Sequence, residues 1–374
     1  MQIRSKRILA LLSDVDFSPQ LIAILQELFN RGAVIRIVLI GSANSQIAKQ
    51  IALRGWKSKN IRQRGKVTSI CNFLLVSIEI IWNRPHTLFA SGQFATIIGM
   101  LSAKLFNIPN RVFIRHHSNI HHKYAMKFGI AMDQISNRLA TTIVAVSEVV
   151  KKILIDVESV NSDKVEIIYN GVNLIEFNSQ PPISRRVSRQ HIQEERLFHI
   201  GVISRLTEWK GVEYTATAFV RLQKEFPESR LHIVGAFADS YLEVRNILSI
   251  VDSNAYTLDK INSKIPYFLQ GLDAFVHVPI GFDDEAFGIV YIEALASGIP
   301  SIFTQSGVLN ELETPNRYAA IVAYRNSEEI YLNLKEMIQG NYQSKSVVPQ
   351  SWLDQFSLDN MAKAYGELLL SEGQ

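Results

Sequence analysis

Short apolar runs alternate with longer amphipathic segments along the whole chain. Those of the first half that predict strands are Lys6–Leu12, Val34–Gly41, Thr87–Ala90, Val112–Ile114, Thr142–Val146 and Val165–Ile168. Those of the second half are Leu197–Ile203, Arg230–Val234, Ala274–Val278, Ser301–Phe303 and Ala320–Val322. Segments between them, such as Pro19–Arg31 and Ala95–Phe106, have the spacing of amphipathic helices. Buried strands that alternate with helices predict an α/β fold with parallel sheets covered on both faces.

The length of 374 residues exceeds what one ordinary core needs and fits two doubly wound domains. A polar stretch with two prolines separates the halves. We therefore expect an N-terminal domain at 1–178, a linker at 179–191, a second domain at 192–350 and a C-terminal helical segment at 351–374. In such a pair of domains the ligand binds in the cleft between them, beyond the carboxyl ends of the strands.

The net charge of +4 conceals two halves of opposite sign. Residues 1–180 hold 22 Lys or Arg and 11 Asp or Glu, a charge of +11, whereas the remainder has 17 and 24, a charge of −7. Six of the basic residues fall between Arg54 and Lys66, a run without a carboxylate. One interpretation is a surface for anionic lipid headgroups or a phosphorylated acceptor; the other is a solvated basic loop. No nucleic-acid recognition motif accompanies the run, so we expect no nucleic-acid partner.

The single cysteine, Cys71, lies in an apolar run. A lone cysteine cannot form an internal disulfide, which favours a buried thiol in a reducing compartment. We expect a cytoplasmic protein, with the inner face of the membrane as the place of any peripheral contact. The uncharged stretch from Thr87 to Ala103 is too short for a membrane span.

A helix that follows an acidic loop carries one set of candidate ligands. The strand ending at Val278 is followed by the loop PIGFDDEAFG and by a helix predicted at about 287–297. Its N-terminal amides, with the flexible Gly288, suit an anion such as a diphosphate. Glu285 and Glu293 are spaced to face the cleft together and accept hydrogen bonds from sugar hydroxyls. The alternative is that Glu285 is a helix-terminal carboxylate and Glu293 a solvated one.

A second set of candidate ligands follows the strand that ends near Ser204. Arg205 and Lys210 flank the short loop that leads to the next helix. Two cations at the carboxyl end of a strand suit a phosphate, which Arg binds as a fork and Lys as a point charge. The alternative for this pair is an ordinary surface location. No glycine-rich dinucleotide fingerprint and no Walker-type lysine loop is present, which argues against a dehydrogenase or a P-loop enzyme.

The stretch RHHSNIHH, from Arg115 to His122, holds four of the nine histidines. It begins where the strand Val112–Ile114 ends, so His116 and His117 are expected at the carboxyl edge of the first sheet. A metal site would need several neutral imidazoles that converge with carboxylate support. We expect no metal here.

Four motifs in order resemble a known family. They are the Glu-x7-Glu signature at Glu285 and Glu293, the Gly-x-x-Ser-Arg-Leu-x-x-x-Lys-Gly loop at Gly201–Gly211, the segment Ile168–Asn173, and Ile233–Gly235. With them the chain resembles, over nearly its whole length, the retaining nucleotide-sugar glycosyltransferases of family 4, also called glycosyl transferases group 1. The resemblance implies the GT-B fold, in which two Rossmann-like doubly wound domains face each other across a cleft. It also implies that the final helix, within 351–374, crosses back to the N-terminal, acceptor-binding domain.

The resemblance further assigns roles to individual residues. Arg205 and Lys210, with the amides near Phe287, Gly288 and Ile289, would stabilise the leaving diphosphate. Glu293 would bind the ribose and Glu285 the donor sugar, and His116 would lie near that sugar, with His117 as the near alternative. The catalytic residues implied are His116, Glu285, Arg205 and Lys210; those that hold the donor are Arg205, Lys210, Gly235, Phe287, Gly288, Ile289 and Glu293; those on the acceptor side are Asp14, Asp16, His117 and His121.

One departure from the family pattern is the turn after the first strand, where Asp14-Val-Asp16 replaces the usual glycine pair. The two carboxylates are either ligands of an acceptor hydroxyl or caps of the first helix. This departure supports the alternative function, a catalytically silent protein of the same fold that binds a sugar nucleotide or acts as a scaffold.

The resemblance implies transfer of a sugar, with retention, from a nucleotide-diphosphate sugar to a saccharide or lipid-linked saccharide, in the synthesis of surface polysaccharide or glycolipid. The donor is a substrate, a UDP-sugar being preferred, and no cofactor is expected. A nucleotide-sugar 2-epimerase of the same fold would need additional acid–base carboxylates.

Overall fold

The computed structural model describes residues 6–13, 16–41, 45–62, 65–177, 197–236, 241–260, 264–343 and 345–371, with the side chains of 65–69 left out. The chain divides into two compact units, Met1–Gly171 with Gln355–Gln374, and Val172–Asp354. The expected linker at 179–191 lies outside the described residues. The boundary between the units falls between Gly171 and Val172, earlier than the predicted bound at 178.

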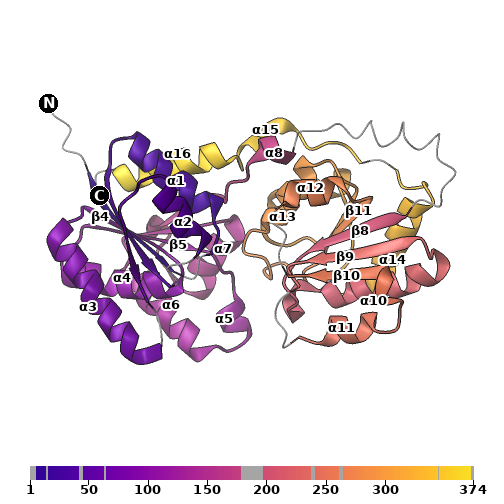
Figure 1. Cartoon of the computed structure of the whole chain (residues 1–374), viewed down its shortest axis with the longest axis horizontal. Helices are drawn as coiled ribbons and strands as arrows, with labels where there is room; N and C mark the ends of the chain where they lie inside the picture. The colour runs from indigo at the N-terminus through magenta and orange to yellow at the C-terminus, as the bar shows by residue number, and fades with distance from the viewer. Residues whose placement is uncertain are drawn as a thin grey trace. The chain divides into compact units, whose positions relative to one another are not determined.

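The first unit is built on a parallel sheet with the strand order β3-β2-β1-β4-β5-β6-β7 among the described residues (Figure 1). The strands are β1 (Arg7–Ser13), β2 (Val34–Ile40), β3 (Ser58–Ile61), β4 (Thr87–Ser91), β5 (Asn110–Arg115), β6 (Thr142–Ala145) and β7 (Val165–Ile167). Every neighbouring pair is parallel. The central strand β1 is buried along nearly its whole length because helices cover both of its faces.

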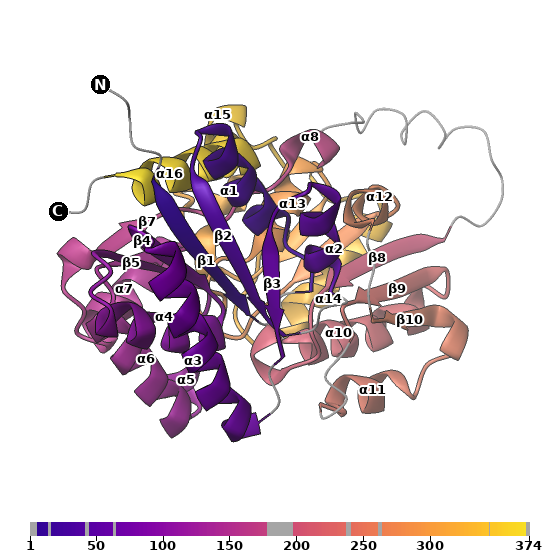
Figure 2. The same cartoon turned by 60° about the vertical axis from the view of Figure 1, so that its left-hand side comes forward.

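Helices pack on both faces of this sheet. They are α1 (Pro19–Asn30), α2 (Gln46–Leu53), α3 (Gly65–Asn83), α4 (Gln93–Leu105), α5 (Ile120–Lys123), α6 (Lys127–Leu139), α7 (Glu148–Lys152) and α16 (Leu358–Leu370), with the short turns η1 (Ile153–Val157) and η2 (Ser162–Lys164). Helix α4 packs on β1, β4 and β5 and lies between α3 and α6, whereas α16 packs against α1 (Figure 2). The C-terminal helix α16 is therefore part of the first unit.

Contacts with β4 hold α16 in the first unit. The Thr87 hydroxyl donates to the Leu369 carbonyl at 3.2 Å, and the Lys6 ammonium donates to the Leu370 carbonyl at 2.5 Å. The buried ring of Tyr365 packs edge-on against Phe89, with 5.9 Å between the ring centroids. The first core thus contains residues from both ends of the chain.

The second unit repeats the architecture with the strand order β10-β9-β8-β11-β12-β13, all parallel, among the described residues. Its strands are β8 (Phe198–Ile203), β9 (Ser229–Val234), β10 (Tyr256–Asp259), β11 (Ala274–His277), β12 (Ser301–Phe303) and β13 (Ala320–Ile321). Its helices are α8 (Leu174–Phe177), α10 (Val212–Glu225), α11 (Glu243–Leu248), α12 (Ile265–Gln270), α13 (Ile289–Ala296), α14 (Ser327–Ile338) and α15 (Gln350–Asp354), with the 3₁₀ turns η4 (Glu208–Lys210), η5 (Ser253–Ala255), η6 (Gly307–Glu311) and η7 (Pro315–Arg317).

The α/β class with two parallel, doubly wound sheets is confirmed, and each predicted strand has an observed counterpart. Two strands, β3 and β10, were not predicted. Both are edge strands, and β3, with the sequence SKNI, buries only its last residue. An edge strand packs on one side only and does not require the continuous apolar run that marks a buried strand.

The expectation of a buried Cys71 is wrong, because Cys71 is exposed on α3. The apolar run around it does not mark a fully buried segment, because apolar side chains of α3 are also exposed. Among the described residues, no helix combines the length and the apolarity needed to cross a bilayer.

Candidate functional site

In the second unit, the loop that follows β8 is fastened to the end of β11. Gly211 has the left-handed φ of +64°, and a Cβ there would lie 2.1 Å from the Val278 carbonyl oxygen, so the position requires glycine. The Ile280 amide also donates to the Trp209 carbonyl at 3.2 Å. The loop therefore holds Lys210 close to the end of β11, whereas the Arg205 side chain is exposed.

Lys210, Glu285 and His277 form a buried polar cluster. The Lys210 ammonium donates to Oε1 of Glu285, and Nε2 of His277 lies 2.8 Å from the same oxygen. Burial by itself would raise the pKa of Glu285, but the charge of Lys210 and the hydrogen bond from His277 outweigh it and hold the pKa at about 2. Burial lowers the pKa of His277. The cluster thus consists of an ammonium, a carboxylate and a neutral imidazole.

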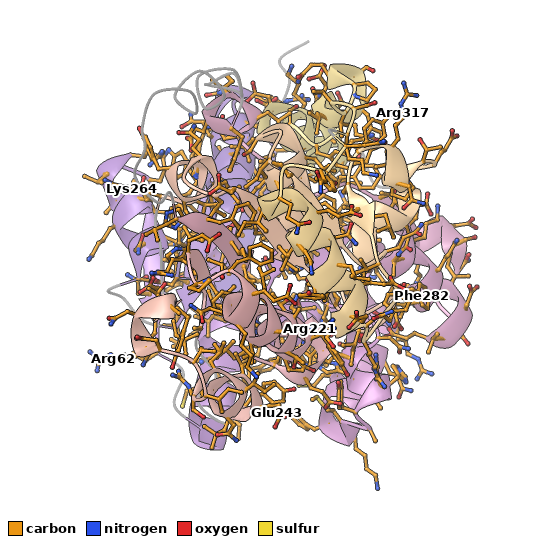
Figure 3. All side chains as sticks on the ribbon, turned by 90° about the vertical axis from the view of Figure 1, so that its right-hand side faces the viewer. Arg62, Arg221, Glu243, Lys264, Phe282 and Arg317 are labelled. Carbon is orange, nitrogen blue, oxygen red and sulfur yellow. The ribbon has the colours of Figure 1, made fainter. Side chains whose placement is uncertain are left out.

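The loop that carries Glu285 is itself held by hydrogen bonds. The Glu285 amide donates to the Ser306 hydroxyl at 3.1 Å, and that hydroxyl donates to the Gly281 carbonyl at 2.7 Å. Phe282, in the same loop, projects at the surface and is more than half exposed (Figure 3). The loop thus fixes the carboxylate while it keeps other side chains accessible.

The start of α13 lies directly after this loop. Gly288, the N-cap, has a φ of +82°, and a Cβ there would lie 2.5 Å from the ring of Tyr291. The first amides of a helix have no partner within the helix and bind anions, with Phe287 buried before them and Ile289 as the first helical residue. The predicted helix start at 287 is confirmed to within two residues.

The strand order brings Gly235 to the same edge of the sheet. It follows β9 with a φ of +88°, and a Cβ there would lie 3.0 Å from the Ser204 carbonyl oxygen. Because β9, β8 and β11 are neighbours, their carboxyl ends place Gly235, Arg205 and Lys210 along one edge with Glu285. The structure therefore brings Arg205, Lys210 and Gly235, three of the predicted donor-side residues, to the edge of the sheet where Glu285 lies.

Glu293 differs from Glu285 in its surroundings. It lies in the middle of α13, is partly buried, and its carboxyl has no hydrogen-bond or ion-pair partner among the residues that the structure describes. Burial raises its pKa to about 7. The interpretation of Glu293 as a fully solvated carboxylate is wrong. A carboxyl group of this kind is available to accept hydrogen bonds from a ligand.

His116 lies in the first unit, at the carboxyl ends of β4 and β5. Its Nε2 lies 3.1 Å from the Ser91 hydroxyl oxygen. Part of its surface is exposed, yet the surrounding protein and the neighbouring His117 lower its pKa. Gly92, the next residue after Ser91, has a φ of +91°, and a Cβ there would lie 2.2 Å from the Ser13 carbonyl oxygen. His116 and His117 line a small pocket at this edge, which confirms their predicted position in the sheet.

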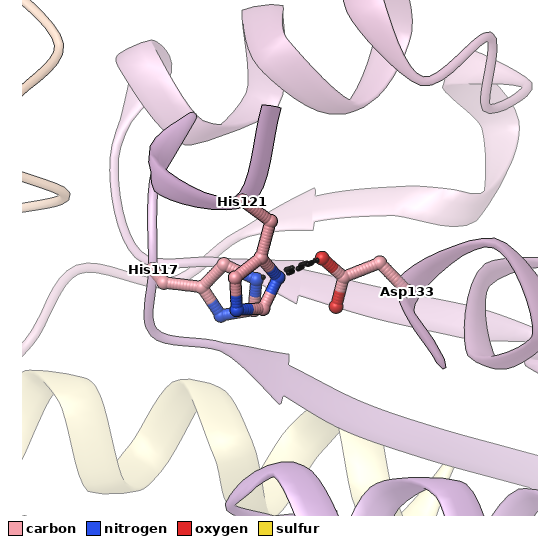
Figure 4. Close-up of side chains that lie close together, drawn as sticks. All are labelled: His117, His121 and Asp133. Atoms are coloured by element: carbon pink, nitrogen blue, oxygen red, sulfur yellow. Dashed lines mark hydrogen bonds and ion pairs between the residues drawn. The ribbon is translucent and has the colours of Figure 1, made fainter. Parts of the chain in front are cut away.

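His117 and His121 converge on Asp133 of α6 (Figure 4). Oδ2 of Asp133 lies 3.0 Å from Nε2 of His117 and 2.6 Å from Nδ1 of His121, and the two imidazole centroids are 4.3 Å apart. Burial alone would raise the pKa of Asp133, but the hydrogen bond from His117 and the charge of Arg115 outweigh it and lower the pKa. Burial lowers the pKa of His117.

Arg115 contacts both Asp133 and the backbone of His117. Its buried guanidinium makes a two-pronged ion pair with Glu158, and its NH2 group lies 3.4 Å from Oδ2 of Asp133. Nε of Arg115 donates to the His117 carbonyl at 3.1 Å, and His122 lies 3.6 Å from Glu158. The four histidines therefore lie in three environments: His116 is beside Ser91, His117 and His121 are on Asp133, and His122 is near Glu158.

Asp133, Glu158 and His277 were missed by the sequence analysis. One signal was available for Asp133, because it is the only acidic residue between positions 80 and 147, a segment that contains several cations. A lone carboxylate in such a segment is expected to pair with one of them. His277 offered a weaker signal, a histidine inside a strand that is otherwise apolar.

The ligand atoms of His117, His121 and Asp133 all lie within 4.8 Å of one another and form a donor set that zinc accepts. Their observed separations of 2.6 and 3.0 Å are those of hydrogen bonds. The Arg115 guanidinium next to Asp133 already supplies a positive charge there. The arrangement therefore favours a hydrogen-bonded cluster, and the absence of a metal stays a prediction.

The acidic turn after β1 has a partly structural role. Asp14 lies outside the described residues, but Asp16 accepts a hydrogen bond from the Gln46 amide at 3.0 Å and thus caps the start of α2. The first helix, α1, is capped by Ser18, which accepts from the Leu21 amide at 3.2 Å. The alternative that Asp16 caps the first helix is wrong. Its role toward an acceptor stays a prediction.

Two family models match successive parts of the chain. "Glycosyltransferase Family 4" matches residues 24–176, and "Glycosyl transferases group 1" matches residues 184–349. Among curated proteins, an uncharacterized glycosyltransferase of Methanocaldococcus jannaschii is 25% identical over 62% of this chain and 60% of its own length. A GDP-mannose-dependent alpha-(1-6)-phosphatidylinositol monomannoside mannosyltransferase of Mycobacterium tuberculosis is 24% identical over 46% of each chain. These alignments thus span about half of the relatives' lengths.

Among solved structures, HepE of Anabaena in complex with UDP and glucose superposes with a TM-score of 0.77 and 17% identity. The superposition covers 97% of this chain and 99% of that one, which shows a common fold. The two family models together cover both Rossmann-like units, at residues 24–176 and 184–349, so the chain belongs to the family 4 glycosyltransferases of the GT-B fold.

Proposed function

We propose that the protein transfers a sugar, with retention of the anomeric configuration, from a nucleotide-diphosphate sugar to a saccharide or lipid-linked saccharide acceptor. The observation that carries the proposal is the cluster of Lys210, Glu285 and His277 beside the start of α13. It supplies a fixed cation and a fixed carboxylate next to amides that suit a diphosphate.

Each group at this edge has a distinct task in the proposed reaction. Lys210 and the exposed Arg205 neutralise the charge that develops on the leaving diphosphate, together with the amides of Gly288 and Ile289. Gly235 allows the nucleotide to approach the backbone closely. Lys210 and the two amides are held in place before the sugar nucleotide binds. They therefore do not need to reorganise as the bond to the sugar breaks.

The two glutamates bind hydroxyl groups in the proposed complex. Glu293 accepts hydrogen bonds from the ribose, and Glu285 accepts them from the donor sugar while Lys210 keeps it ionised. In the proposed mechanism the acceptor attacks from the face that the diphosphate leaves, which retains the anomeric configuration. The leaving phosphate then serves as the base, so the mechanism needs no protein nucleophile. A stereochemical assay by NMR of the product distinguishes retention from inversion.

His116 and the acceptor-side residues are assigned by the same proposal. The histidine lies near the donor sugar and contributes its imidazole, which is neutral at pH 7 because the surrounding protein lowers its pKa. Asp14, Asp16, His117 and His121 belong to the acceptor side. Full transfer activity in His116→Ala would contradict the assignment of His116.

The donor is proposed to be a UDP-sugar, and two proteins similar to this chain indicate different nucleotide bases. HepE was solved with UDP, whereas the mycobacterial relative is named as dependent on GDP-mannose. Thermal-shift titrations with UDP-glucose, UDP-galactose, GDP-mannose and the free nucleotides decide between them. A larger stabilisation by GDP-mannose than by any UDP-sugar would contradict the preference for UDP.

The alternative function is a protein that binds a sugar nucleotide or serves as a scaffold without catalysis. The test is hydrolysis of the sugar nucleotide by purified protein in the absence of an acceptor, because only an enzyme catalyses it. Lys210→Ala and Glu285→Ala are expected to abolish this hydrolysis. The control is Lys224→Ala, which removes an exposed lysine from α10. Donor binding without hydrolysis or transfer would favour the scaffold.

The place of action is part of the proposal. We place the protein in the cytoplasm, at the inner face of the membrane, with no cofactor and no nucleic-acid partner, and in the synthesis of surface polysaccharide or glycolipid. The basic run Arg54–Lys66 would contact anionic lipid headgroups. Within it, Lys59 is an internal partner of Glu79 at 2.9 Å and belongs to β3, so the run is not a simple solvated loop.

A further inference from the structure

The outer surface of α3 is apolar. Ile70, Leu74, Ile78, Ile81 and Trp82 are all exposed, Trp82 to 79% and Ile70 to 68%. At the helical repeat of about 100° per residue, the five side chains fall within roughly a third of the circumference. The opposite side of the helix carries the buried residues that face the sheet. Helix α3 therefore has, besides the side that packs on the protein, an apolar face that the rest of the described chain leaves uncovered.

The neighbouring helix extends this surface. Helix α4 packs beside α3 (Figure 2), and its residues Leu101 and Leu105, one turn apart, are exposed. We call the set of Ile70, Leu74, Ile78, Ile81, Trp82, Leu101 and Leu105 the α3–α4 face. Single exposed apolar residues are ordinary, but several of them on the outer sides of two adjoining helices mark an interaction surface.

The charges around the α3–α4 face all have one sign. Between positions 28 and 132 the sequence contains fifteen Lys or Arg and one acidic residue, Glu79. The side chain of Glu79 is 3% exposed and is paired with Arg36 at 2.8 Å and with Lys59 at 2.9 Å. No carboxylate from this part of the chain is therefore available at the surface.

Cations lie beside the apolar side chains rather than far from them. Along the chain, Arg84 follows the last turn of α3, Lys104 lies between the two exposed leucines of α4, and Arg62 precedes α3. All three are exposed, and no ion pair is recorded for them within the described residues. This combination of apolar side chains with a cationic rim is the chemistry of a surface that inserts into a bilayer interface.

We propose that the α3–α4 face docks on an anionic lipid bilayer, with its apolar side chains at the boundary of headgroups and acyl chains and its cations on the lipid phosphates. The observed charge favours this occupant over a second copy of the chain, because two such faces would bring like charges together. Nucleic acid would satisfy the cations but would leave the apolar side chains in contact with water. The proposal rests on the membrane contact in the proposed function and extends it from the basic run Arg54–Lys66 onto α3 and α4.

The test is flotation of the full chain with vesicles of phosphatidylglycerol and phosphatidylcholine, compared with phosphatidylcholine alone. The wild type is expected to float only with the anionic vesicles. The triple variant Leu74→Ser, Ile81→Ser, Trp82→Ser is expected to float at least about fivefold less, since it removes apolar insertion. The matched control is Leu242→Ser, Ile175→Ser, Val347→Ser, which makes the same kind of change at exposed positions of the second unit.

Two further measurements separate insertion from simple charge attraction. Trp82 fluorescence is expected to shift to the blue with anionic vesicles, and the shift is expected to be lost in Trp82→Phe. Arg84→Gln with Lys104→Gln is expected to weaken flotation and its dependence on salt, whereas Lys224→Gln with Arg317→Gln has no effect. Circular dichroism and UDP-sugar affinity, which should be unchanged in all variants, report the fold and the donor site separately.

Several results would overturn the proposal. They are flotation of the apolar triple variant at the wild-type level, equal flotation with neutral vesicles, and no flotation of the wild type. A wild-type dimer that the same triple variant converts to a monomer would assign the face to a second copy of the chain. Tight binding to a polynucleotide that the triple variant leaves unchanged would assign the cations to nucleic acid and contradict the membrane proposal.

Discussion

Lys210 and Glu285 form an ion pair although 75 positions separate them in the sequence. The pair exists because β8 and β11 are neighbours in the sheet, which brings the loops after both strands together. His277, the last residue of β11, completes the contact by bonding to the same carboxylate oxygen.

Acid should weaken the folded state through Glu285. Its pKa is about 2 in the folded protein against 4.5 for the ordinary group, so its contribution is fully present above pH 4.5 and is lost as the pH falls toward 2. Glu285→Gln should lower the free energy of unfolding at pH 7 and show a smaller further loss between pH 4.5 and 3. Urea unfolding at each pH measures this. Glu313→Gln, an exposed change, should behave as the wild type.

Donor binding should depend on the ionisation of Glu293. Burial raises its pKa to about 7, and the ribose hydroxyls donate to the ionised form. The affinity for the sugar nucleotide should therefore rise roughly tenfold from pH 6 to pH 8. Isothermal titration calorimetry measures this affinity. The sugar nucleotide is used rather than the free nucleotide because it lacks a terminal phosphate that titrates near pH 6. Glu293→Gln should bind more weakly and without this pH dependence.

Ionisation of Glu293, which strengthens donor binding, should weaken the folded state without ligand. A carboxyl whose pKa is raised on folding holds its proton more tightly in the folded state. Stability without ligand should therefore fall as the pH rises from 4.5 to 7 and then level off. Glu293→Gln should remove this fall. A pH-independent affinity in the wild type would contradict the role of Glu293 at the ribose.

Gly211→Ala should disturb the loop that holds Lys210. The alanine would adopt an unfavourable φ of +64° and place its Cβ against the Val278 carbonyl, so we expect a loss of about 2–4 kcal/mol in the free energy of unfolding and a large loss of donor affinity. Gly340→Ala is a matched control, because Gly340 has a φ of +73° but nothing within 4 Å of its Cβ position. Equal effects of the two substitutions would show that the close approach to Val278 is unimportant.

Asp133→Asn should destabilise the first unit by about 2 kcal/mol. The neutral amide oxygen accepts hydrogen bonds from the two imidazoles more weakly than the charged carboxylate does, and Glu158 is then left as the only carboxylate beside Arg115 among the described residues. Urea unfolding at pH 7.5 measures the effect. The control is Asp156→Asn, an exposed change nearby in the sequence. NMR titration should also show a lower pKa for His117 in the variant, because the Asp133 carboxylate favours the charged imidazole.

Local patterns predicted the buried parts of the fold well. Central strands such as β1 and β11 need continuous apolar runs, and those runs are visible in the sequence. Edge strands and exposed helix faces have no such requirement. For that reason β3 was missed, and Cys71 was expected inside although it is exposed.

The sequence by itself determined the α/β class, the glycines that permit tight turns, and the spacing that places Glu285 before α13 and Glu293 within it. Only the tertiary structure decided which charged groups meet. The order of the strands joins Lys210 to Glu285 and His277, and the packing of α6 against α4 and α5 brings Asp133 to His117 and His121. These contacts depend on which strands are neighbours, and that arrangement follows from the packing of the whole core rather than from any local pattern.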